Sequence, residues 1–519
     1  MTCTSTQHTL LHITMKQSLC LLLCALTLIL SSCLDEQTFP TPADARIAFS
    51  ADTLDFDTVI INRESPTVQF SVYNKSSKGI RITSVAFEGK DKDAFLANVH
   101  GYFIQPGVPV SIDCAGKDSI TAFAQFNAQD NDNDQAVISE ADLVFTLANG
   151  VSQKVHVMGY SQAVVELRGK TFTSDVTLQA TRPFAVYDSL VVKPGTTLTI
   201  APGSTLLFAS DAGIKVEGTL VAKGTREEPI VFRGNRYDNM FKNQPYDRID
   251  NQWQGIRLTS SSYDNHLDHC DIHSGNYGIT CDSADQSRLK LKLENSVLHN
   301  VRRNALTIDQ CQVFVGNTQI SNAENNCVDV TGGHSTFVHC TIGWFSPFST
   351  RQGNALVFTN HKGDNACPIS QLTFYNSIIT GHNSDEIFAY TSSNESISNN
   401  YAFYNSLLNT PEIKDKPNVV NNVWENRQST VKQAANFVNF DYSALIYDFR
   451  LAADSPARFI ADPAITQQYY PLDRLGTPRL TNNLPDAGCY QYVEIPTERQ
   501  YRCGAPQRKT HRECNLSSH

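Results

Sequence analysis

The sequence predicts an all-β chain in which a β-sandwich is followed by a long solenoid of parallel strands. The main observation is a four-residue pattern (polar, small, variable, aliphatic) that recurs at steps of 22 to 37 residues. Repeats of about this length with inserts at fixed places indicate a solenoid. The copies are His269-Cys270-Asp271-Ile272, Asn295-Ser296-Val297-Leu298, Asn317-Thr318-Gln319-Ile320, His339-Cys340-Thr341-Ile342, Asn376-Ser377-Ile378-Ile379 and Asn405-Ser406-Leu407-Leu408.

Side-chain alternation explains the pattern. Alternate residues of a strand face opposite sides, so the small and the aliphatic positions share one side and the polar and variable positions share the other. We expect the small and aliphatic side to face inward. One coil cannot bury its apolar side alone, so the coils must stack. Asn at the same position of successive coils suits ladders of side-chain amides at a bend. The repeat is too short for a pair of helices and lacks helical periodicity.

The predicted solenoid resembles the right-handed parallel β-helix of pectate-lyase-like proteins. Its opening coils resemble those of secreted bacterial β-helix proteins, in which a Trp-Gln-Gly-Ile segment follows, here Trp253-Gln254-Gly255-Ile256. We expect the β-helix over residues 163–445. The motif around Gly488-Cys489-Tyr490 resembles the C-terminal segment of such proteins, so residues 446–495 are predicted to cap the last coil. The polar residues 496–519 are predicted to form a disordered tail.

The preceding domain is expected over residues 46–162. Val68, Phe70 and Val72 alternate with polar residues, and turns such as Asn149-Gly150 separate several short segments of this kind. Seven or so short strands in about 115 residues indicate an immunoglobulin-like sandwich. The order of features resembles the ASH-type sandwich, and this resemblance implies a spacer or a binding module.

The first 45 residues predict an export signal and a tether. An apolar run from Leu19 to Leu30 follows Met15-Lys16, which we take as the true start, and it is too short to span a membrane. Leu30-Ser31-Ser32-Cys33 resembles a bacterial lipobox. The resemblance implies residues 1–33 as signal peptide, a lipid on Cys33, and an outer-membrane lipoprotein of a Gram-negative, Bacteroidetes-type bacterium, with surface exposure suggested by the acidic flank Asp35-Glu36. Residues 34–45 read as a tether.

The net charge limits the possible binding partners, and the cysteine positions indicate the state of the thiols. The 519 residues carry a formal net charge of -10, which argues against a nucleic-acid partner. Three of the 14 cysteines lie in the leader, and several others take small inward-facing positions. We therefore predict mostly free, buried thiols rather than a disulfide framework. The predicted partners are the membrane, through the lipid on Cys33, and a polysaccharide.

Candidate ligand-binding residues lie on the outward positions. His273 and His299 occupy the same outward register on adjacent coils, Arg302 and Arg303 follow on the next bend, and Asp329 lies one coil further on. These five side chains are candidates for binding an anionic sugar. The alternative is that they are solvated surface residues without a ligand. The Cys and His spacings match no zinc pattern, so no metal site is predicted. No cofactor is predicted either, although the pectate-lyase resemblance implies Ca²⁺ if the chain is a lyase.

The sequence supports three functions and does not establish catalysis. The first is a lipid-anchored cell-envelope protein whose β-helix binds polysaccharide or another surface ligand. The second is a polysaccharide lyase or related carbohydrate-active enzyme, which needs a base and a cation near the substrate carboxylate. The third is an adhesive or structural surface protein.

Overall fold

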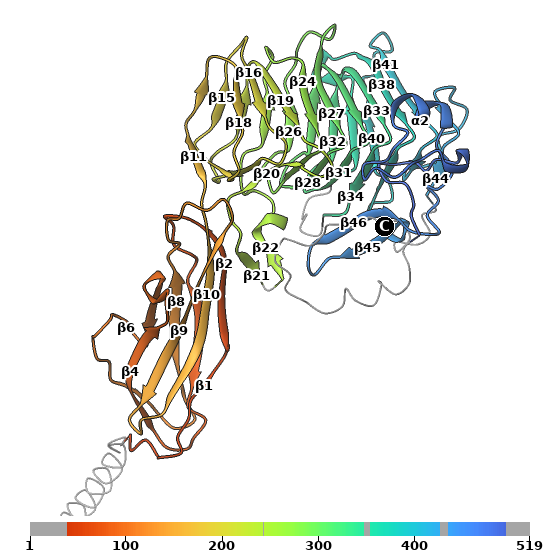
Figure 1. Cartoon of the computed structure of the whole chain (residues 1–519). Helices are drawn as coiled ribbons and strands as arrows, with labels where there is room; N and C mark the ends of the chain where they lie inside the picture. The colour runs from red at the N-terminus through yellow and green to blue at the C-terminus, as the bar shows by residue number, and fades with distance from the viewer. Residues whose placement is uncertain (1–38, 242, 347–352, 426–433, 495–519) are drawn as a thin grey trace, which may run out of the picture. The chain divides into compact units, whose positions relative to one another are not determined.

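The computed structural model describes residues 39–494 except 242, 347–352 and 426–433 (Figure 1). The described residues form two compact units, one of residues 39–130 with 137–161 and one of residues 131–136 with 162–494. The predicted signal peptide, Cys33 and the tail after residue 495 lie outside the described residues. None of the helices within the described ranges is long and apolar enough to cross a membrane.

The first unit is a sandwich of two five-stranded sheets (Figure 1). One sheet has the order β1 (Ala48–Phe49), β3 (Val68–Tyr73), β8 (Ser119–Phe126), β5 (Phe95–Val99) and β6 (Tyr102–Phe103). The other has the order β2 (Thr53–Ile60), β10 (Ser152–Gln162), β9 (Val137–Leu147), β4 (Ile80–Glu88) and β7 (Ile112–Cys114). Neighbours such as β9 and β10 pair antiparallel, and the rings of Phe56 on β2 and Phe126 on β8 lie 6.3 Å apart between the sheets. The predicted sandwich is confirmed.

The second unit is a parallel β-helix with three long sheets (Figure 1). Its 11-stranded sheet contains β11 (Val165–Arg168), β14 (Phe184–Tyr187), β17 (Thr205–Phe208), β20 (Ile230–Gly234), β25 (Cys270–His273), β28 (Val297–Val301), β31 (Gln319–Ala323), β34 (Thr341–Trp344), β39 (Ile378–Gly381), β42 (Leu407–Leu408) and β44 (Val423–Trp424). Its nine-stranded sheet contains β12 (Thr171–Phe172), β15 (Leu190–Val192), β18 (Ile214–Val216), β23 (Ile256–Leu258), β26 (Ile279–Cys281), β29 (Leu306–Asp309), β32 (Val328–Thr331), β35 (Leu356–Thr359) and β40 (Ile387–Tyr390).

The third sheet of the β-helix has ten strands. They are β13 (Val176–Leu178), β16 (Thr197–Ile200), β19 (Thr219–Lys223), β24 (Asn265–Asp268), β27 (Leu289–Glu294), β30 (Gln312–Gly316), β33 (Gly333–Val338), β38 (Ile369–Tyr375), β41 (Asn399–Tyr404) and β43 (Val419–Val420). Two short hairpins project from the coils, β21 (Asn239–Phe241) with β22 (Gln244–Pro245) and β36 (His361–Lys362) with β37 (Asn365–Ala366). The predicted parallel β-helix is confirmed by the strand pairing.

The small inward positions form a ladder of hydroxyl groups inside the β-helix. Ser296 Oγ accepts a hydrogen bond from the backbone N–H of Cys270 at 3.0 Å and donates to the carbonyl of Glu294 at 2.6 Å. Ser377 Oγ accepts from Cys340 N at 3.1 Å, and Ser406 Oγ accepts from Ser377 N at 3.0 Å. Each hydroxyl thus satisfies a backbone group of the coil before it, so a small polar residue is accommodated in the core.

The polar residue before each of these small residues forms a sharp bend between the ten-stranded and the 11-stranded sheets. These residues, here called the bend column, are His269, Asn295, Asn317, His339, Asn376 and Asn405, and their φ angles all lie between 48° and 51°. Non-glycine residues seldom adopt this left-handed conformation, and Asn and His are among those that tolerate it best. The predicted amide ladder is present in part, because Asn317 Nδ2 donates to Asn295 Oδ1 at 2.7 Å.

The cysteines of the described residues are free and buried. They are Cys114, Cys270, Cys281, Cys311, Cys327, Cys340, Cys367 and Cys489. Cys270 and Cys340 have no exposed surface and occupy the small inward position of their coils. The prediction of buried, unpaired thiols is confirmed for this part of the chain.

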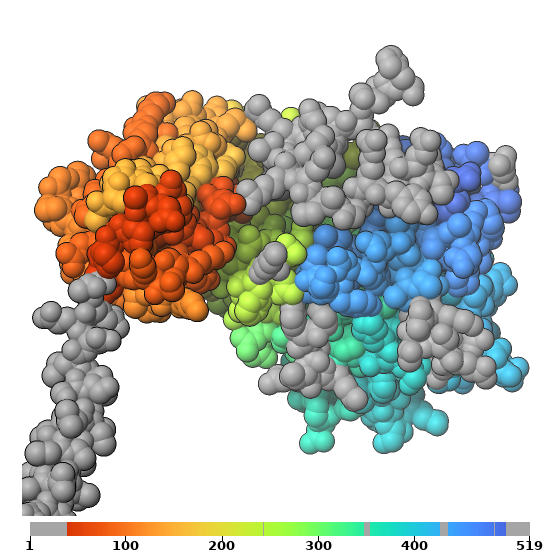
Figure 2. Space-filling model, turned by 90° about the horizontal axis from the view of Figure 1, so that it is seen from below, coloured from red at the N-terminus to blue at the C-terminus, as the bar shows by residue number. Residues whose placement is uncertain are grey.

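The C-terminal segment, residues 434–494, lies along the side of the β-helix. It contains β45 (Phe437–Asp441), β46 (Ile446–Leu451) and the short helix α2 (Pro463–Tyr469), and Figure 2 shows it in blue against the green and cyan coils. The bend column supplies its hydrogen-bond partners: Asn405 Nδ2 donates to the carbonyl of Ile460 at 3.2 Å, and Arg479 Nη2 donates to Asn317 Oδ1 at 2.8 Å. The C-terminal segment, predicted to cap the last coil over residues 446–495, therefore also contacts the bends of earlier coils.

We expect Ser296→Ala to lower the free energy of unfolding by about 1–3 kcal/mol, because it leaves a buried N–H and a buried carbonyl without their hydroxyl partner. Denaturant unfolding of the purified protein measures the effect. Ser396→Ala, at an exposed loop position, is the control and should change stability little. Equal effects of the two substitutions would contradict a structural role for the ladder.

Candidate functional site

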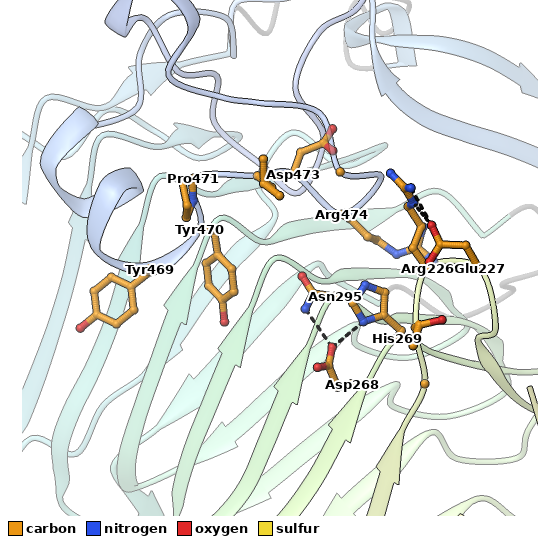
Figure 3. Close-up of a pocket in the computed structure, with 14 residues that line it drawn as sticks. Arg226, Glu227, Asp268, His269, Asn295, Tyr469, Tyr470, Pro471, Asp473 and Arg474 are labelled. Atoms are coloured by element: carbon orange, nitrogen blue, oxygen red, sulfur yellow. Dashed lines mark hydrogen bonds and ion pairs between the residues drawn. The ribbon is translucent and has the colours of Figure 1, made fainter. Parts of the chain in front are cut away.

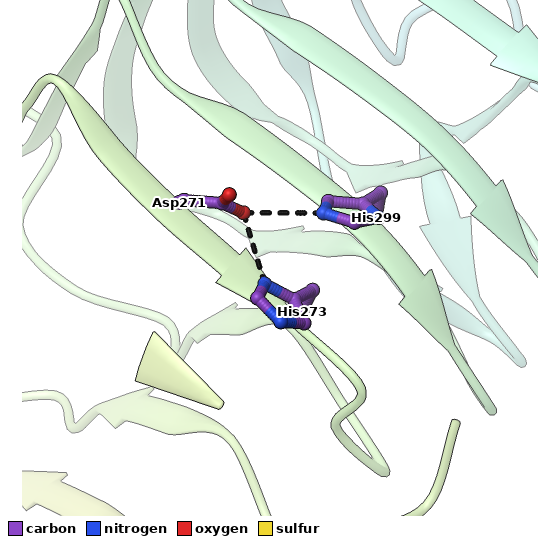
Figure 4. Close-up of side chains that lie close together, drawn as sticks. All are labelled: Asp271, His273 and His299. Carbon is purple, nitrogen blue, oxygen red and sulfur yellow. Dashed lines mark hydrogen bonds and ion pairs between the residues drawn. The ribbon is translucent and has the colours of Figure 1, made fainter. Parts of the chain in front are cut away.

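His273 and His299 lie side by side on the outer face of the 11-stranded sheet. They are register partners on β25 and β28, and their rings stack with centroids 4.8 Å apart. Asp271 lies on the same face as His273 and joins the pair (Figure 4). Its Oδ1 is 3.0 Å from Nδ1 of His273 and 3.1 Å from Nε2 of His299. The sequence therefore places the two histidines correctly, and the structure adds a carboxylate between them.

The other predicted binding residues do not join this cluster. Asp329 lies on β32 of the nine-stranded sheet, where its carboxylate accepts a hydrogen bond from Asn326 at 2.8 Å. The guanidinium of Arg303 lies 5.7 Å from the ring centre of Tyr277. Arg302 interacts with Asp250. Arg302, Arg303 and Asp329 thus have partners other than the two histidines, and binding of an anionic sugar by the five side chains stays a prediction.

Buried aromatic packing fixes the backbone beneath the cluster. Trp253 is buried, and its ring stacks on Phe208 with centroids 4.3 Å apart and an interplanar angle of 14°. Its indole N–H donates a 2.7 Å hydrogen bond to the carbonyl of His273. The Trp-Gln-Gly-Ile segment therefore holds the end of β25, and so the position of the imidazole, through one directed hydrogen bond and a stacked pair.

Burial and charge act in opposite directions on Asp271 and on His273. Burial disfavours the charged carboxylate, yet the two imidazoles hold the pKa of Asp271 well below its ordinary value. Burial lowers the pKa of His273, and the attraction of Asp271 opposes this change. Arg233, which forms an ion pair with Asp247 at 3.4 Å, lies close enough to contribute to the lowering at His273. The arrangement is that of a carboxylate hydrogen-bonded to two imidazoles.

A groove of about 560 Å³ lies beside this face, between the bend column and the C-terminal segment (Figure 3). Tyr469, Tyr470 and Arg474 line one wall, and Arg226 and His269 belong to the other. Tyr469 is 38% exposed, and its ring stacks beside Phe314 at 5.9 Å. Such a groove combines an aromatic surface with hydrogen-bonding groups, as small-molecule and sugar sites commonly do.

An ionic network holds the C-terminal wall of the groove. Glu294 accepts a hydrogen bond from the hydroxyl of Tyr470 at 2.7 Å and lies 2.5 Å from the ammonium of Lys292. It also contacts His266 Nε2 at 3.0 Å. Although burial opposes its charged form, these partners lower the pKa of Glu294 to about 2. A small residue makes room for the contact, since a side chain at Gly316 would collide with the Tyr470 hydroxyl.

A pair of acidic residues lies where strands of the 11-stranded sheet end, opposite the bend column. Asp250, from the segment after the β21–β22 hairpin, interacts with Glu324 and with Arg302. Burial and the charge of Glu324 raise the pKa of Asp250 to about 7, against the lowering effect of Arg302. A carboxyl group with this pKa can donate a proton near neutral pH.

Sequence reasoning missed several of these residues for identifiable reasons. Asp271 could have been found, since it is two residues before His273 and must face the same side. Asp250 and the groove-lining residues from Tyr469 to Arg474 had no such signal. They come from a long insert and from the C-terminal segment, whose path over the coils is set by tertiary contacts.

No family model matches the chain. Over 65 residues, 12% of its length, the chain is 42% identical to Protein bark beetle of Drosophila melanogaster, and it spans 2% of that protein. An ASH/PapD-like domain of human CEP192 is 9% identical with a TM-score of 0.17, covering 25% of this chain and 94% of that one. Pectate lyase Pel9A is 16% identical with a TM-score of 0.24, covering 59% and 88%. The fold assignment stands on the strand pairing.

We expect Glu294→Gln to loosen the C-terminal wall at neutral pH. A folded-state pKa of about 2 lies below the ordinary 4.5, so the stabilisation is present above pH 4.5 and is lost as the pH falls through 2. The difference of about 2.5 pKa units corresponds to about 3 kcal/mol. Hydrogen exchange of residues 466–476 should therefore be faster in Glu294→Gln than in the wild type at pH 7, with the difference shrinking as the pH is lowered.

The control for this experiment is Glu166→Gln. Glu166 is exposed and forms a 3.6 Å ion pair with Arg168. The Glu166→Gln substitution should leave the hydrogen exchange of residues 466–476 unchanged. A constant difference between wild type and Glu294→Gln from pH 7 down to pH 3 would show that the charge of Glu294 does not hold this wall.

Proposed function

We propose that the chain is a lipid-anchored cell-envelope protein whose β-helix binds a polysaccharide in the groove lined by Tyr469 and Arg226. The groove itself is the observation that carries the proposal. Its exposed tyrosine ring offers a surface on which the apolar face of a sugar ring can stack. The amide of Asn295 and the imidazole of His269 are partners for hydroxyl groups.

The charges of the groove favour a polar ligand over a strongly anionic one. Arg226 is paired with Glu227 at 2.6 Å, and His269 Nδ1 lies 2.8 Å from Asp268 Oδ1. Hydrogen bonds from His269 and Asn295 outweigh burial and lower the pKa of Asp268, which is therefore charged at neutral pH. Because Arg226 and His269 already have acidic neighbours, hydrogen bonding and stacking are the main sources of affinity.

A carbohydrate-active enzyme is the second candidate, and the pair of Asp250 and Glu324 favours it. Glycoside hydrolases use two carboxyl groups, one of which has a raised pKa and acts as the acid. The pKa of Asp250, about 7, fits that role. New reducing ends or unsaturated uronates formed from a polysaccharide, and lost in Asp250→Asn, would replace the binding proposal by this one. The absence of products from polysaccharides that bind would favour the binding module.

We expect Tyr469→Ala to weaken polysaccharide binding about 5–10-fold, because a stacked ring contributes about 1–1.5 kcal/mol. The chain from Asp35 onward would be tested against a panel of immobilised neutral and acidic polysaccharides. Tyr390→Ala is the matched control, since Tyr390 is 58% exposed on β40 of another sheet. Equal losses in both variants, or no binding by the wild type to any member of the panel, would refute the groove as the binding site.

The anchor is tested separately. In cells supplied with an alkyne-labelled fatty acid, we expect the wild-type chain to become labelled and to fractionate with the envelope. Cys33→Ala should remove the label, whereas Cys24→Ala should keep it, because only the cysteine after the Leu-Ser-Ser sequence matches the lipobox pattern. Labelling that persists in Cys33→Ala would disprove the anchor without affecting the proposed groove.

A further inference from the structure

The cluster of Asp271, His273 and His299 has the composition of a metal site. One ligating atom from each residue (Oδ1, Nδ1 and Nε2) lies within 4.8 Å of the others. Asp271 Oδ1 lies 3.0 Å from His273 Nδ1 and 3.1 Å from His299 Nε2. For an ion about 2.1 Å from each atom, the two ligand–ion–ligand angles to Asp271 Oδ1 would be about 90–95°. These are the cis angles of an octahedral or facial arrangement.

The ligand atoms select the class of ion. Two imidazole nitrogens and one carboxylate suit divalent first-row transition ions such as Zn²⁺, Co²⁺, Ni²⁺ or Fe²⁺. Calcium and magnesium take oxygen ligands almost entirely.

The cluster is open to solvent on one side. The side chains of Asp271 and His299 are 35% and 24% exposed, while that of His273 is 9% exposed. Three protein ligands with an open side leave coordination positions for water or for a ligand. Arg233 and Arg474 both interact with members of the cluster, and their positive charges favour an anion as the additional ligand.

A second group of suitable residues differs in one decisive respect. His266, Asp268 and Glu294 also bring three ligating atoms within 4.8 Å. There, however, the ammonium of Lys292 lies 2.5 Å from Glu294 and already supplies the positive charge. The Asp271 carboxylate has no lysine partner among the ion pairs of the described residues, and its neighbours are the two imidazoles.

We propose that Asp271, His273 and His299 bind one divalent transition-metal ion on the outer face of the 11-stranded sheet. This inference is independent of the proposed polysaccharide groove. In the absence of metal, the same atoms form hydrogen bonds between the imidazoles and the carboxylate, so the apo protein keeps the arrangement. When the ion binds, it takes the place of the N–H proton at each ligating nitrogen, and each neutral imidazole then carries its proton on the other ring nitrogen.

The test uses the purified protein after treatment with a chelator and dialysis against Zn²⁺, Co²⁺ or Ni²⁺ in turn. We expect one equivalent of metal per chain by elemental analysis, together with the visible absorption of bound Co²⁺. His299→Ala and Asp271→Asn should each weaken binding by more than the roughly 10–100-fold that loss of an outer partner costs. His266→Ala, which removes a histidine of the other group, should bind like the wild type.

Three outcomes would overturn the proposal. The first is a wild-type protein that retains no stoichiometric metal. The second is metal retained in both His299→Ala and Asp271→Asn, which would place it elsewhere in the chain. The third is metal lost only in His266→Ala. Asp271→Asn keeps the size and shape of the side chain, so it decides the question if His299→Ala fails to fold, as judged by its circular dichroism spectrum.

Discussion

The left-handed bend between the ten-stranded and the 11-stranded sheets is the constraint on which the rest of the β-helix depends. Six bend residues share a φ angle near 50°, from His269 to Asn405. Each bend starts the next strand in the same phase, so the small and the aliphatic side chains always face inward. A bend displaced by one residue would bring Ile272 to the surface and Asp271 into the core. The positions of Asp271, His273 and His299 are thus a consequence of the bend.

The same bends provide the surface on which the C-terminal segment packs. Asn and His at φ near 50° present side-chain donors and acceptors that the β-ladders do not use, and Asn376 accepts a 2.8 Å hydrogen bond from Asp462 N. Glycines at outward positions of the strands allow the C-terminal segment to pack closely. A side chain at Gly343, for example, would collide with Phe449. Hydrogen bonds at the bends and glycines on the strands therefore fix the path of the C-terminal segment. The groove exists because that path leaves space next to Asn295.

The sequence predicted the coils well because they repeat. The inward burial of Cys270, Ile272, Ser296 and Leu298 follows from alternation within one four-residue pattern. The register of His273 with His299 follows from the same pattern. The course of the C-terminal segment and the position of Asp250 could not be predicted in this way, because neither belongs to a repeat. Asp329 was grouped with the histidines by coil number, but it lies on β32 of the nine-stranded sheet.

Two groups of histidine and acid on adjacent sheets show how one added charge changes the role of a cluster. In the group around Glu294, Lys292 neutralises the carboxylate and the tyrosine of the C-terminal segment adds a hydrogen bond, so the group joins the segment to the coils. Around Asp271 the neighbours are imidazoles, and the carboxylate keeps its charge and partial exposure. Arg474 lines the groove and also interacts with Asp271. Any cation that neutralises Asp271 therefore changes the electrostatic field at the groove wall, although the two sites share no residue.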